Sequence, residues 1–200
     1  MKKGMIILLL IFCSCNQQET KEFTIDAGIK DKVKNKIKYS ELLGKEEESF
    51  FYETEVYMEY FEDDKLEASI TGKSNNTAFR SFYFKRNDTL SIMGAYGMFD
   101  GSGFSVKIYE GEAEVYALVT SGETPYYSLN EEGERKARLD VPSIKSKLIL
   151  SEYPDVAKTN PIYGYVEFES AEFYSGLDGD NQTKERFNMK VYFKSIHFEL

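Results

Sequence analysis

Cysteine and histidine are nearly absent from this chain of 200 residues, and tryptophan is absent altogether. The two cysteines, Cys13 and Cys15, lie close to the start, so the rest of the chain has no thiol for a disulfide, a cysteine nucleophile or a Cys-based zinc site. The single histidine, His197, excludes a two-histidine metal site within one chain. We expect the fold to be stable through its core alone.

Motifs of nucleophilic hydrolysis are also missing. The chain contains no Gly-x-Ser-x-Gly elbow and no Ser-x-x-Lys pair. A serine triad would have to use His197, which strand alternation places on a solvent-facing side with Ser195 and Glu199. Among 34 acidic residues some pair always has a separation suited to glycoside cleavage, so their number is no argument for it. We therefore predict no catalytic residues and no enzyme, with a carboxylate-dependent hydrolase as the least favoured alternative.

Acidic side chains outnumber basic ones, and the formal net charge is −9. Removal of residues 1–14 takes away two lysines and no acid, which makes the charge −11. This balance argues against electrostatic binding of nucleic acid or anionic headgroups. A basic partner or divalent cations stay open, and a solvated acidic surface is the favoured interpretation.

The first fourteen residues have the composition of an export signal. Two lysines open a short positive region, residues 5–12 are apolar, and Ser14 precedes Cys15. An apolar run of this length is well below the roughly twenty residues that a membrane-spanning helix needs. We predict that residues 1–14 are a signal peptide.

This segment resembles the signals of bacterial lipoproteins, which carry a small residue immediately before the acylated cysteine. Ser14 meets that requirement before Cys15, whereas Phe12 does not meet it before Cys13. The resemblance implies a lipidated Cys15, whose acyl chains hold the protein on a membrane. Asn16 stands where inner-membrane retention calls for Asp, which implies the outer membrane, on its periplasmic or surface face.

Residues 15–48 are polar and rich in lysine, and we predict that they form a tether outside the fold. As a flexible coil this segment would hold the domain about 30 Å from the membrane. Ile29, Val33 and Ile37 recur every four residues, which permits a short helix that runs through Leu43 and ends at Gly44. The alternative is an N-terminal strand at residues 23–25.

From Ser49 onward apolar residues recur at every second position, which predicts strands. The 15 tyrosines and 15 phenylalanines suit half-buried pleated surfaces. We predict one all-β domain at residues 49–200, an antiparallel β-sandwich of immunoglobulin-like or related type, with an open or closed β-barrel as the alternative. Strands are expected at 50–60, 66–71, 78–85, 90–93, 104–109, 113–120, 126–130, 144–151, 162–174 and 186–200.

The last two expected strands form a hairpin, and each changes phase. The apolar pattern shifts near Ser170 in the first and near residues 194–195 in the second, which predicts a bulge in each. The run Ile162–Phe168, with the preceding residues 148–150 and the closing aromatic strand, resembles the C-terminal part of small β-sandwich lipoproteins. That resemblance implies a sandwich and transfers no functional residue.

Two loops carry candidate site residues. The glycine-rich loop at residues 94–103 presents Tyr96, Met98 and Phe99 as a candidate ligand-binding tip. Its alternative is a hairpin connection whose aromatic side chains pack back over the end of the sandwich. The loop at residues 175–184 offers three oxygen ligands for calcium, but it lacks the length and terminal glutamate of an EF-hand, so an ordinary turn is favoured. We predict no cofactor and no metal. The three candidate calcium ligands are Asp178, Asp180 and Asn181.

These observations predict a membrane-anchored lipoprotein that acts as a non-catalytic binding or adhesion module of the cell envelope. Its ligand would be a glycan, a peptide or a neighbouring envelope protein. The alternative is a structural accessory subunit of an envelope complex. A deep pocket with converging acids would favour a hydrolase, whereas a filled core and an exposed aromatic surface would favour the other two.

Overall fold

The computed structural model describes residues 20–39, 51–73, 79–96, 102–119, 126–129, 132–137, 140–155, 157–176 and 182–199. This part of the chain is built from strands and one short helix, which confirms the all-β class. The strands are β1 (Thr20–Ile25), β2 (Phe51–Tyr52), β3 (Glu55–Glu62), β4 (Lys65–Lys73), β5 (Phe79–Arg86), β6 (Thr89–Tyr96), β7 (Ser102–Tyr109), β8 (Glu112–Val119), β9 (Tyr126–Leu129), β10 (Arg135–Ala137), β11 (Asp140–Leu150), β12 (Ile162–Ser170), β13 (Phe173–Ser175) and β14 (Thr183–His197), and the helix α1 is Ile29–Lys36.

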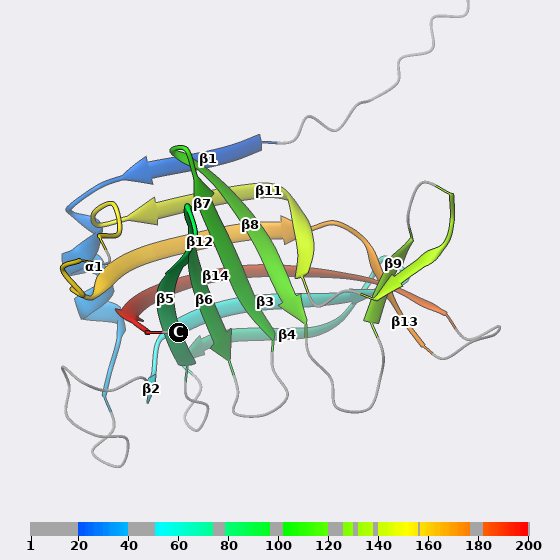
Figure 1. The fold of residues 1–200 in the computed structure, drawn as a ribbon. Helices are drawn as coiled ribbons and strands as arrows, with labels where there is room; N and C mark the ends of the chain where they lie inside the picture. The colour runs from blue at the N-terminus through cyan, green and yellow to red at the C-terminus, as the bar shows by residue number, and fades with distance from the viewer. Residues whose placement is uncertain are drawn as a thin grey trace, which may run out of the picture.

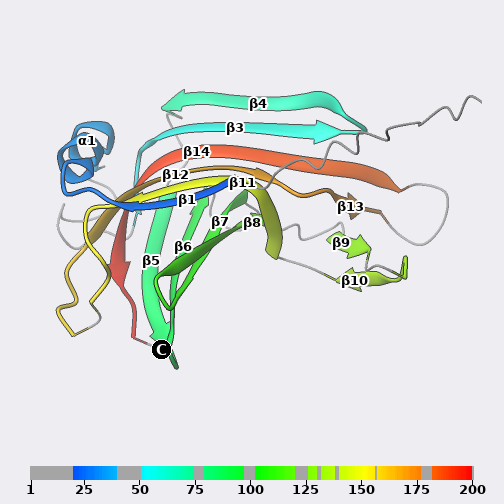
Figure 2. The ribbon, with the colours of Figure 1, turned by 90° about the horizontal axis from the view of Figure 1, so that it is seen from above.

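Most of the strands form two packed sheets (Figures 1 and 2), and β13, β9 and β10 continue from β14 at one end. The long sheet has the order β1, β11, β12, β14, β3, β4, and every pair in it is antiparallel except β1 with β11. The crossing sheet is the run of successive hairpins from β5 to β8, with β2 added beside β5. In Figure 2 the strands of the crossing sheet run across those of the long sheet. The predicted antiparallel sandwich is confirmed, with hairpin connections rather than Greek-key ones in its crossing sheet.

Two strands belong to both sheets and form the corners of the sandwich. β11 pairs with β8 through Asp140–Pro142 and with β12 from Ser143 onward, and its register shifts between Ser143 and Lys145. β14 pairs with β12 and β3 and then, at Ile196–His197, with β5. A bulge bends and twists a strand, which lets it leave one sheet and enter the other.

The predicted bulge near Ser170 is confirmed. Glu169 lies opposite Asn188 and Phe173 lies opposite Glu185, so the β12–β13 side carries one residue more than β14 does. Inward-facing residues are therefore even-numbered up to Ser170 and odd-numbered from Phe173.

The second predicted bulge, near residues 194–195, is wrong, because β14 keeps an unbroken register with β12 through Lys194 and Ser195. Residues 193–195 are buried in succession, and the Ser195 hydroxyl is hydrogen-bonded to that of Ser81. The prediction of a solvent-facing Ser195 is wrong because β14 enters the crossing sheet here, where both sides of the strand are covered. His197 is half-buried, with its ring centre 5.3 Å from that of Tyr83.

The core between the sheets is aromatic, as expected. Phe104 of the crossing sheet and Phe193 of the long sheet lie with ring centres 4.9 Å apart, and Phe79 lies beside Phe104. All three side chains are fully buried. Burial of a side chain of this size stabilises the fold by about 1.5–3 kcal/mol.

The prediction that residues 15–48 form a tether outside the fold is wrong for residues 20–39. β1 pairs with β11 along its whole length, which confirms the alternative strand. Ile29 and Val33 of α1, and Ile37 after it, belong to the core. The helix ends at Lys36 rather than at the predicted Leu43. Residues 15–19 and 40–48 lie outside the described residues. Within the described part of the chain, no helix has the length and apolar composition needed to cross a membrane.

Candidate functional site

Of the three residues predicted to bind a ligand, the structure describes Tyr96 alone. It ends β6 and is half-buried against the core. Tyr96 therefore packs onto the sandwich, and the role of the loop in ligand binding stays a prediction. The predicted residues outside the described part of the chain are Met98, Phe99, Cys15, Asp178, Asp180 and Asn181.

The outer face of the long sheet carries a hollow of about 380 Å³ that no sequence motif indicated. Its side chains come from β1, β11, β12, β14 and β3, and they stand in two rows that run across the strands. We call this hollow the trough. In order from β1 towards β3, the first row is Glu22, Lys147, Glu167, Lys190 and Tyr57, and the second is Lys145, Glu169, Asn188 and Glu59, each residue opposite the next in the strand register.

Strand alternation places these polar side chains outside. The residues between the two rows face inward, as Phe168 and Met189 do, and they are buried. The rows are two residues apart along each strand, which separates them by about 7 Å at about 3.4 Å per residue. The trough is therefore wide enough for one extended chain that lies across the strands.

The charges in the trough alternate in sign from strand to strand and form ion pairs. Three of these pairs have distances from 2.6 to 3.3 Å, and their side chains are between 38% and 64% exposed. Exposed pairs of this kind contribute at most about 1 kcal/mol each to stability. The rows therefore add little to the stability of the fold. The pairs are Lys147 with Glu22, Lys190 with Glu167, and Lys145 with Glu169.

Tyrosine and asparagine side chains orient the remaining carboxylate oxygens. The Tyr165 hydroxyl donates to Glu167 Oε2 at 2.8 Å. Glu59 accepts from the Tyr57 hydroxyl and, at 3.2 Å, from Asn188 Nδ2. Each of these glutamates thus has a fixed position at the floor or wall of the trough.

Glu167 is ionised at neutral pH. Burial raises the pKa of its carboxyl, but the hydrogen bonds from Lys190 and Tyr165 outweigh burial and leave the pKa below its ordinary value. The ionised carboxylate of Glu167 therefore accepts hydrogen bonds and does not act as a proton donor.

A second hollow of about 310 Å³ adjoins the trough at Tyr57 and Lys190, which line both. Thr71 of β4 lines its far side, and the Lys190 Nζ lies 5.8 Å from the centre of the Tyr57 ring. Together the two hollows cross from β1 to β4 over six neighbouring strands. At about 4.8 Å between strands, this path is about 24 Å long.

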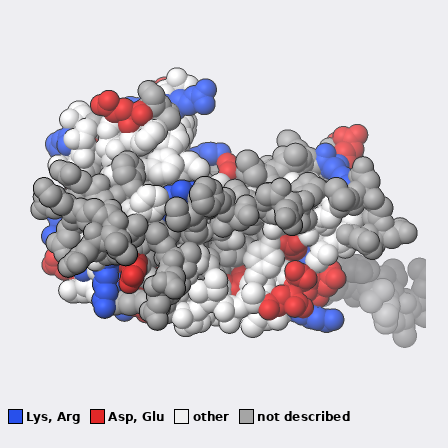
Figure 3. All heavy atoms as spheres, turned by 90° about the horizontal axis from the view of Figure 1, so that it is seen from below, with Lys and Arg blue, Asp and Glu red and all other residues white. Residues whose placement is uncertain are grey.

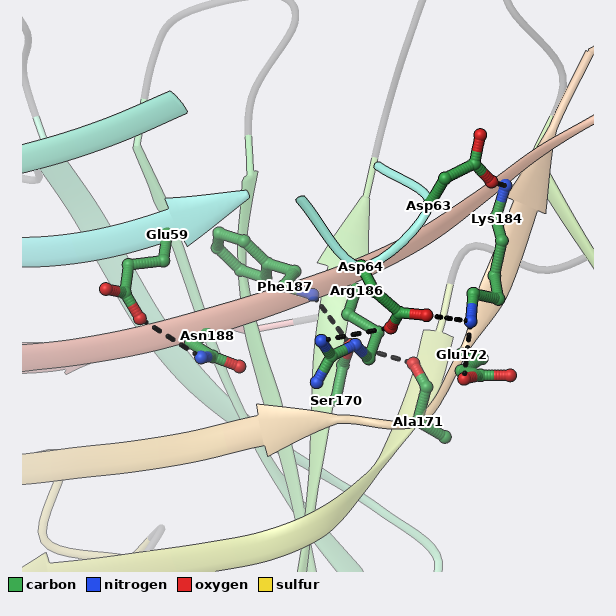
Figure 4. Close-up of polar contacts among 10 residues, drawn as sticks. All are labelled: Glu59, Asp63, Asp64, Ser170, Ala171, Glu172, Lys184, Arg186, Phe187 and Asn188. Carbon is green, nitrogen blue, oxygen red and sulfur yellow. Dashed lines mark hydrogen bonds and ion pairs between the residues drawn. The ribbon is translucent and has the colours of Figure 1, made fainter. Parts of the chain in front are cut away.

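A separate polar cluster lies at the end of the long sheet, at the turn between β3 and β4 (Figure 4). Lys184 Nζ contacts Asp64 at 2.5 Å and Glu172 at 3.4 Å, and Arg186 contacts Asp64 at 3.3 Å. The hydrogen bond from Lys184 is the main reason why the pKa of Asp64 is lowered. These contacts tie the β3–β4 turn to the start of β14.

The same region holds the bulge after β12 in place. The Ser170 hydroxyl accepts from the Phe187 backbone N–H at 2.9 Å and donates to the Ala171 carbonyl at 2.8 Å (Figure 4). The contacts of this cluster hold a turn and a bulge in place, so we assign it a structural role, whereas the trough is a hollow on the surface and is the better candidate site.

The trough has a nearly balanced charge, with four glutamates and three lysines. On the face shown in Figure 3, acidic and basic side chains likewise stand in mixed groups. Among the residues that the structure describes, no group of three or more His, Cys, Asp or Glu side chains is placed to hold a metal ion. The arrangement offers hydrogen-bond donors and acceptors in alternation, and it has no strong field of one sign.

Comparison with models of protein families, with curated proteins and with solved structures gave no match.

Proposed function

We propose that this protein is a lipid-anchored, non-catalytic binding module of the cell envelope, and that its trough binds an extended glycan. The observation that carries this proposal is the pair of donor and acceptor rows that cross the outer face of the long sheet. A chain that lies across the strands would meet a hydrogen-bond donor or acceptor at each strand, about every 4.8 Å.

Several properties of the trough favour a ligand rich in hydroxyl groups. A hydroxyl donates to a carboxylate and accepts from an ammonium group, so alternating glutamates and lysines serve it equally well. The near balance of charge gives little attraction to a polyanion or a polycation. The Tyr57 ring, at the junction of the two hollows, offers an apolar surface against which a sugar ring can pack.

The state of the carboxylates supports binding rather than cleavage. Glycoside hydrolysis needs a carboxylic acid whose pKa is raised so that it can protonate the leaving group. In the trough the pKa of Glu167 is lowered, and Glu22 and Glu169 are ion-paired with lysines. These carboxylates are suited to hold hydroxyl groups.

The anchor belongs to the proposal because it is inferred from residues 1–15 of the sequence. Acylation of Cys15 would keep Thr20 within about 18 Å of the bilayer, since five residues span at most about 3.6 Å each. Thr20 lies opposite Lys145, at one end of the second row. The trough would then lie close to the membrane, and its ligand would be an envelope component.

Binding of neutral and acidic oligosaccharides of several residues, measured by calorimetry, tests the ligand. We expect one class of oligosaccharide to bind, and we expect Lys147→Ala and Glu167→Gln each to weaken that binding at least tenfold. Lys107→Ala is the matched control, because Lys107 is an exposed lysine that is ion-paired with Asp140 on the crossing sheet. Binding by no oligosaccharide, or equal affinity in all variants, would refute the proposal.

Mass spectrometry of the purified N-terminus tests the anchor. An acylated Cys15 at the N-terminus is expected, and Cys15→Ala should release the protein from the membrane fraction. An intact leader with a free thiol at Cys15 would contradict this part of the proposal without affecting the trough.

A further inference from the structure

β4 is the outermost strand of the long sheet on the side away from β1, as Figure 2 shows. Among the described strands it pairs with β3 alone, so one side of its backbone faces outward without a strand partner. Residues 65–71 are all exposed. Free N–H and C=O groups along such an edge are a template for another strand.

Only the first part of this edge is protected. Tyr60 pairs with Ala68 and Phe61 pairs with Leu66, which leaves Glu67 as an extra residue in a bulge. A bulge and a charge both discourage a further strand. From Ala68 to Thr71 the edge carries neither a charge nor a proline.

The opposite edge of the sheet is different. β1 is shorter, it carries charges at Lys21 and Glu22, and the Glu22 carboxylate contacts Lys147 at 3.3 Å. Ile70 on β4 is 39% exposed although it faces inward beside the buried Met58. The β4 edge therefore combines an uncharged backbone with an uncovered apolar side chain.

We propose that β4 pairs antiparallel with β4 of a second copy of this chain, in a two-fold symmetric dimer whose long sheets are continuous. Residues opposite each other in such a pair lie on the same face, so even-numbered inward positions must meet even-numbered ones. A register centred on Ile70 places it opposite the partner's Ile70. It also places Ser69 opposite the partner's Thr71, and Ala68 opposite the partner's Gly72.

Side-chain complementarity selects this register from its neighbours. Centred on Ile70, it sets isoleucine opposite isoleucine and, on either side, Ser69 opposite the partner's Thr71, and cross-strand pairs of both kinds stabilise adjacent strands. A register centred on Ser69 sets Ile70 opposite the partner's Ala68, which buries less apolar surface. A register centred on Thr71 sets Ile70 opposite a glycine and gives up the apolar contact.

The partner is a second copy because the segment complements itself. A two-fold contact of this kind is closed, so it ends at a dimer and does not continue into a fibre. The second hollow reaches Thr71 beside this edge, so pairing would set the hollows of the two copies end to end. The dimer itself does not depend on what the trough binds.

A disulfide tests the register. In the full chain with Cys13→Ser and Cys15→Ser, purified in detergent, Ile70→Cys supplies the only thiol. Opposed residues in an antiparallel pair have Cα atoms about 4.5–5.5 Å apart, within the range of a disulfide. We expect Ile70→Cys to give a dimer on a non-reducing gel. Ala68→Cys should not, because about 13 Å would separate the two introduced thiol positions along the strand.

Sedimentation equilibrium tests the dimer without any introduced thiol. We expect the Cys13→Ser, Cys15→Ser chain to have twice the mass of one chain and Ile70→Lys in that background to have the mass of one. Ile25→Lys is the matched control, because Ile25 is a similarly exposed isoleucine, at 46%, on the opposite edge of the sheet. A monomer at all concentrations overturns the proposal. Equal cross-linking of Ala68→Cys and Ile70→Cys overturns it too.

Discussion

The two faces of the long sheet are made by alternate residues of the same strands, and they differ in what they contribute to the protein. On β12 and β14 the inward-facing Val166 and Met189 are fully buried, while their neighbours Glu167 and Lys190 form an exposed ion pair. Burial of the first pair removes apolar surface from water, whereas the second pair gains little from its contact. The inner face therefore supplies most of the stability of the sheet. Side chains on the outer face can serve recognition at little cost to that stability.

The largest expected effect comes from the inner face. Phe193→Ala removes a fully buried ring that lies 4.9 Å from Phe104. We expect the free energy of unfolding to fall by about 3–5 kcal/mol, because the cavity cannot close fully between two sheets. Urea denaturation measures it. A loss below about 1 kcal/mol would mean that the core does not lie where the ring contacts place it.

The corner where β14 leaves the long sheet should rank second. The Tyr52 hydroxyl donates to the Lys194 carbonyl at 2.9 Å and accepts from the Lys194 N–H at 2.7 Å, so one side chain replaces a strand partner. Tyr52→Phe leaves both buried backbone groups without this partner and should cost about 1–3 kcal/mol. Tyr109→Phe, at a tyrosine that is 50% exposed, is the control and should leave the denaturation midpoint unchanged.

One acid breaks the rule that the inner face is apolar. Glu185 is 4% exposed, and it accepts a hydrogen bond from the Tyr60 hydroxyl. Burial is the main reason why the pKa of its carboxyl lies above the ordinary value of 4.5, and the nearby Glu62 raises the pKa further. Burial therefore disfavours the ionised form of the Glu185 carboxyl.

Glu185→Gln should therefore change how stability depends on pH. Because the folded protein binds the proton more tightly than the unfolded one, the contribution of Glu185 is fully present below pH 4.5 and is lost as the pH rises through the raised pKa. The glutamine variant should lack this loss, so its stability relative to the natural protein should increase as the pH rises from 4.5 to the raised pKa and stay constant above it. Thermal unfolding across the pH range measures the difference. Parallel curves for the two proteins would contradict it.

The smallest effect on stability is expected from the outer face. Lys147→Ala removes one ion pair whose lysine side chain is 47% exposed, and it should cost at most about 1 kcal/mol. The same variant should lose affinity for the glycan, so the binding and denaturation measurements would separate. A large loss of stability would mean that the rows of the trough support the fold and would weaken the comparison between the faces.

Much of the fold was predictable because alternation is a local signal. The inward positions of β12 and the bulge after Ser170 both follow from which neighbouring residues are apolar. The bulge predicted near residue 194 is not in the β12–β14 register, because the apolar residues there do not mark a slip in pairing. The region before residue 40 was not predictable in the same way. β1 finds its partner in β11, more than a hundred residues away, and the lysine-rich α1 needs only Ile29 and Val33 to reach the core.

The candidate site was predictable in its parts but not as a whole. Alternation indicated that Glu167 and Glu169 face outward, but it did not say which side chains stand opposite them. The trough depends on the register of strands from both ends of the chain, which the sequence alone does not contain. Burial of Ser195 was missed because it depends on the passage of β14 into the second sheet.

The central place of β14 in the fold has a consequence for folding during synthesis of the chain. β14 follows the other described strands in chain order and borders β12, β3 and β5, so the edges of those three strands stay unmatched until residues 183–197 have been synthesised. Contacts between segments so distant in sequence form slowly, and open strand edges attract other chains in the meantime. Synthesis that stops before residue 183 would thus release an aggregation-prone product, and a chaperone is most needed until β14 has emerged from the ribosome.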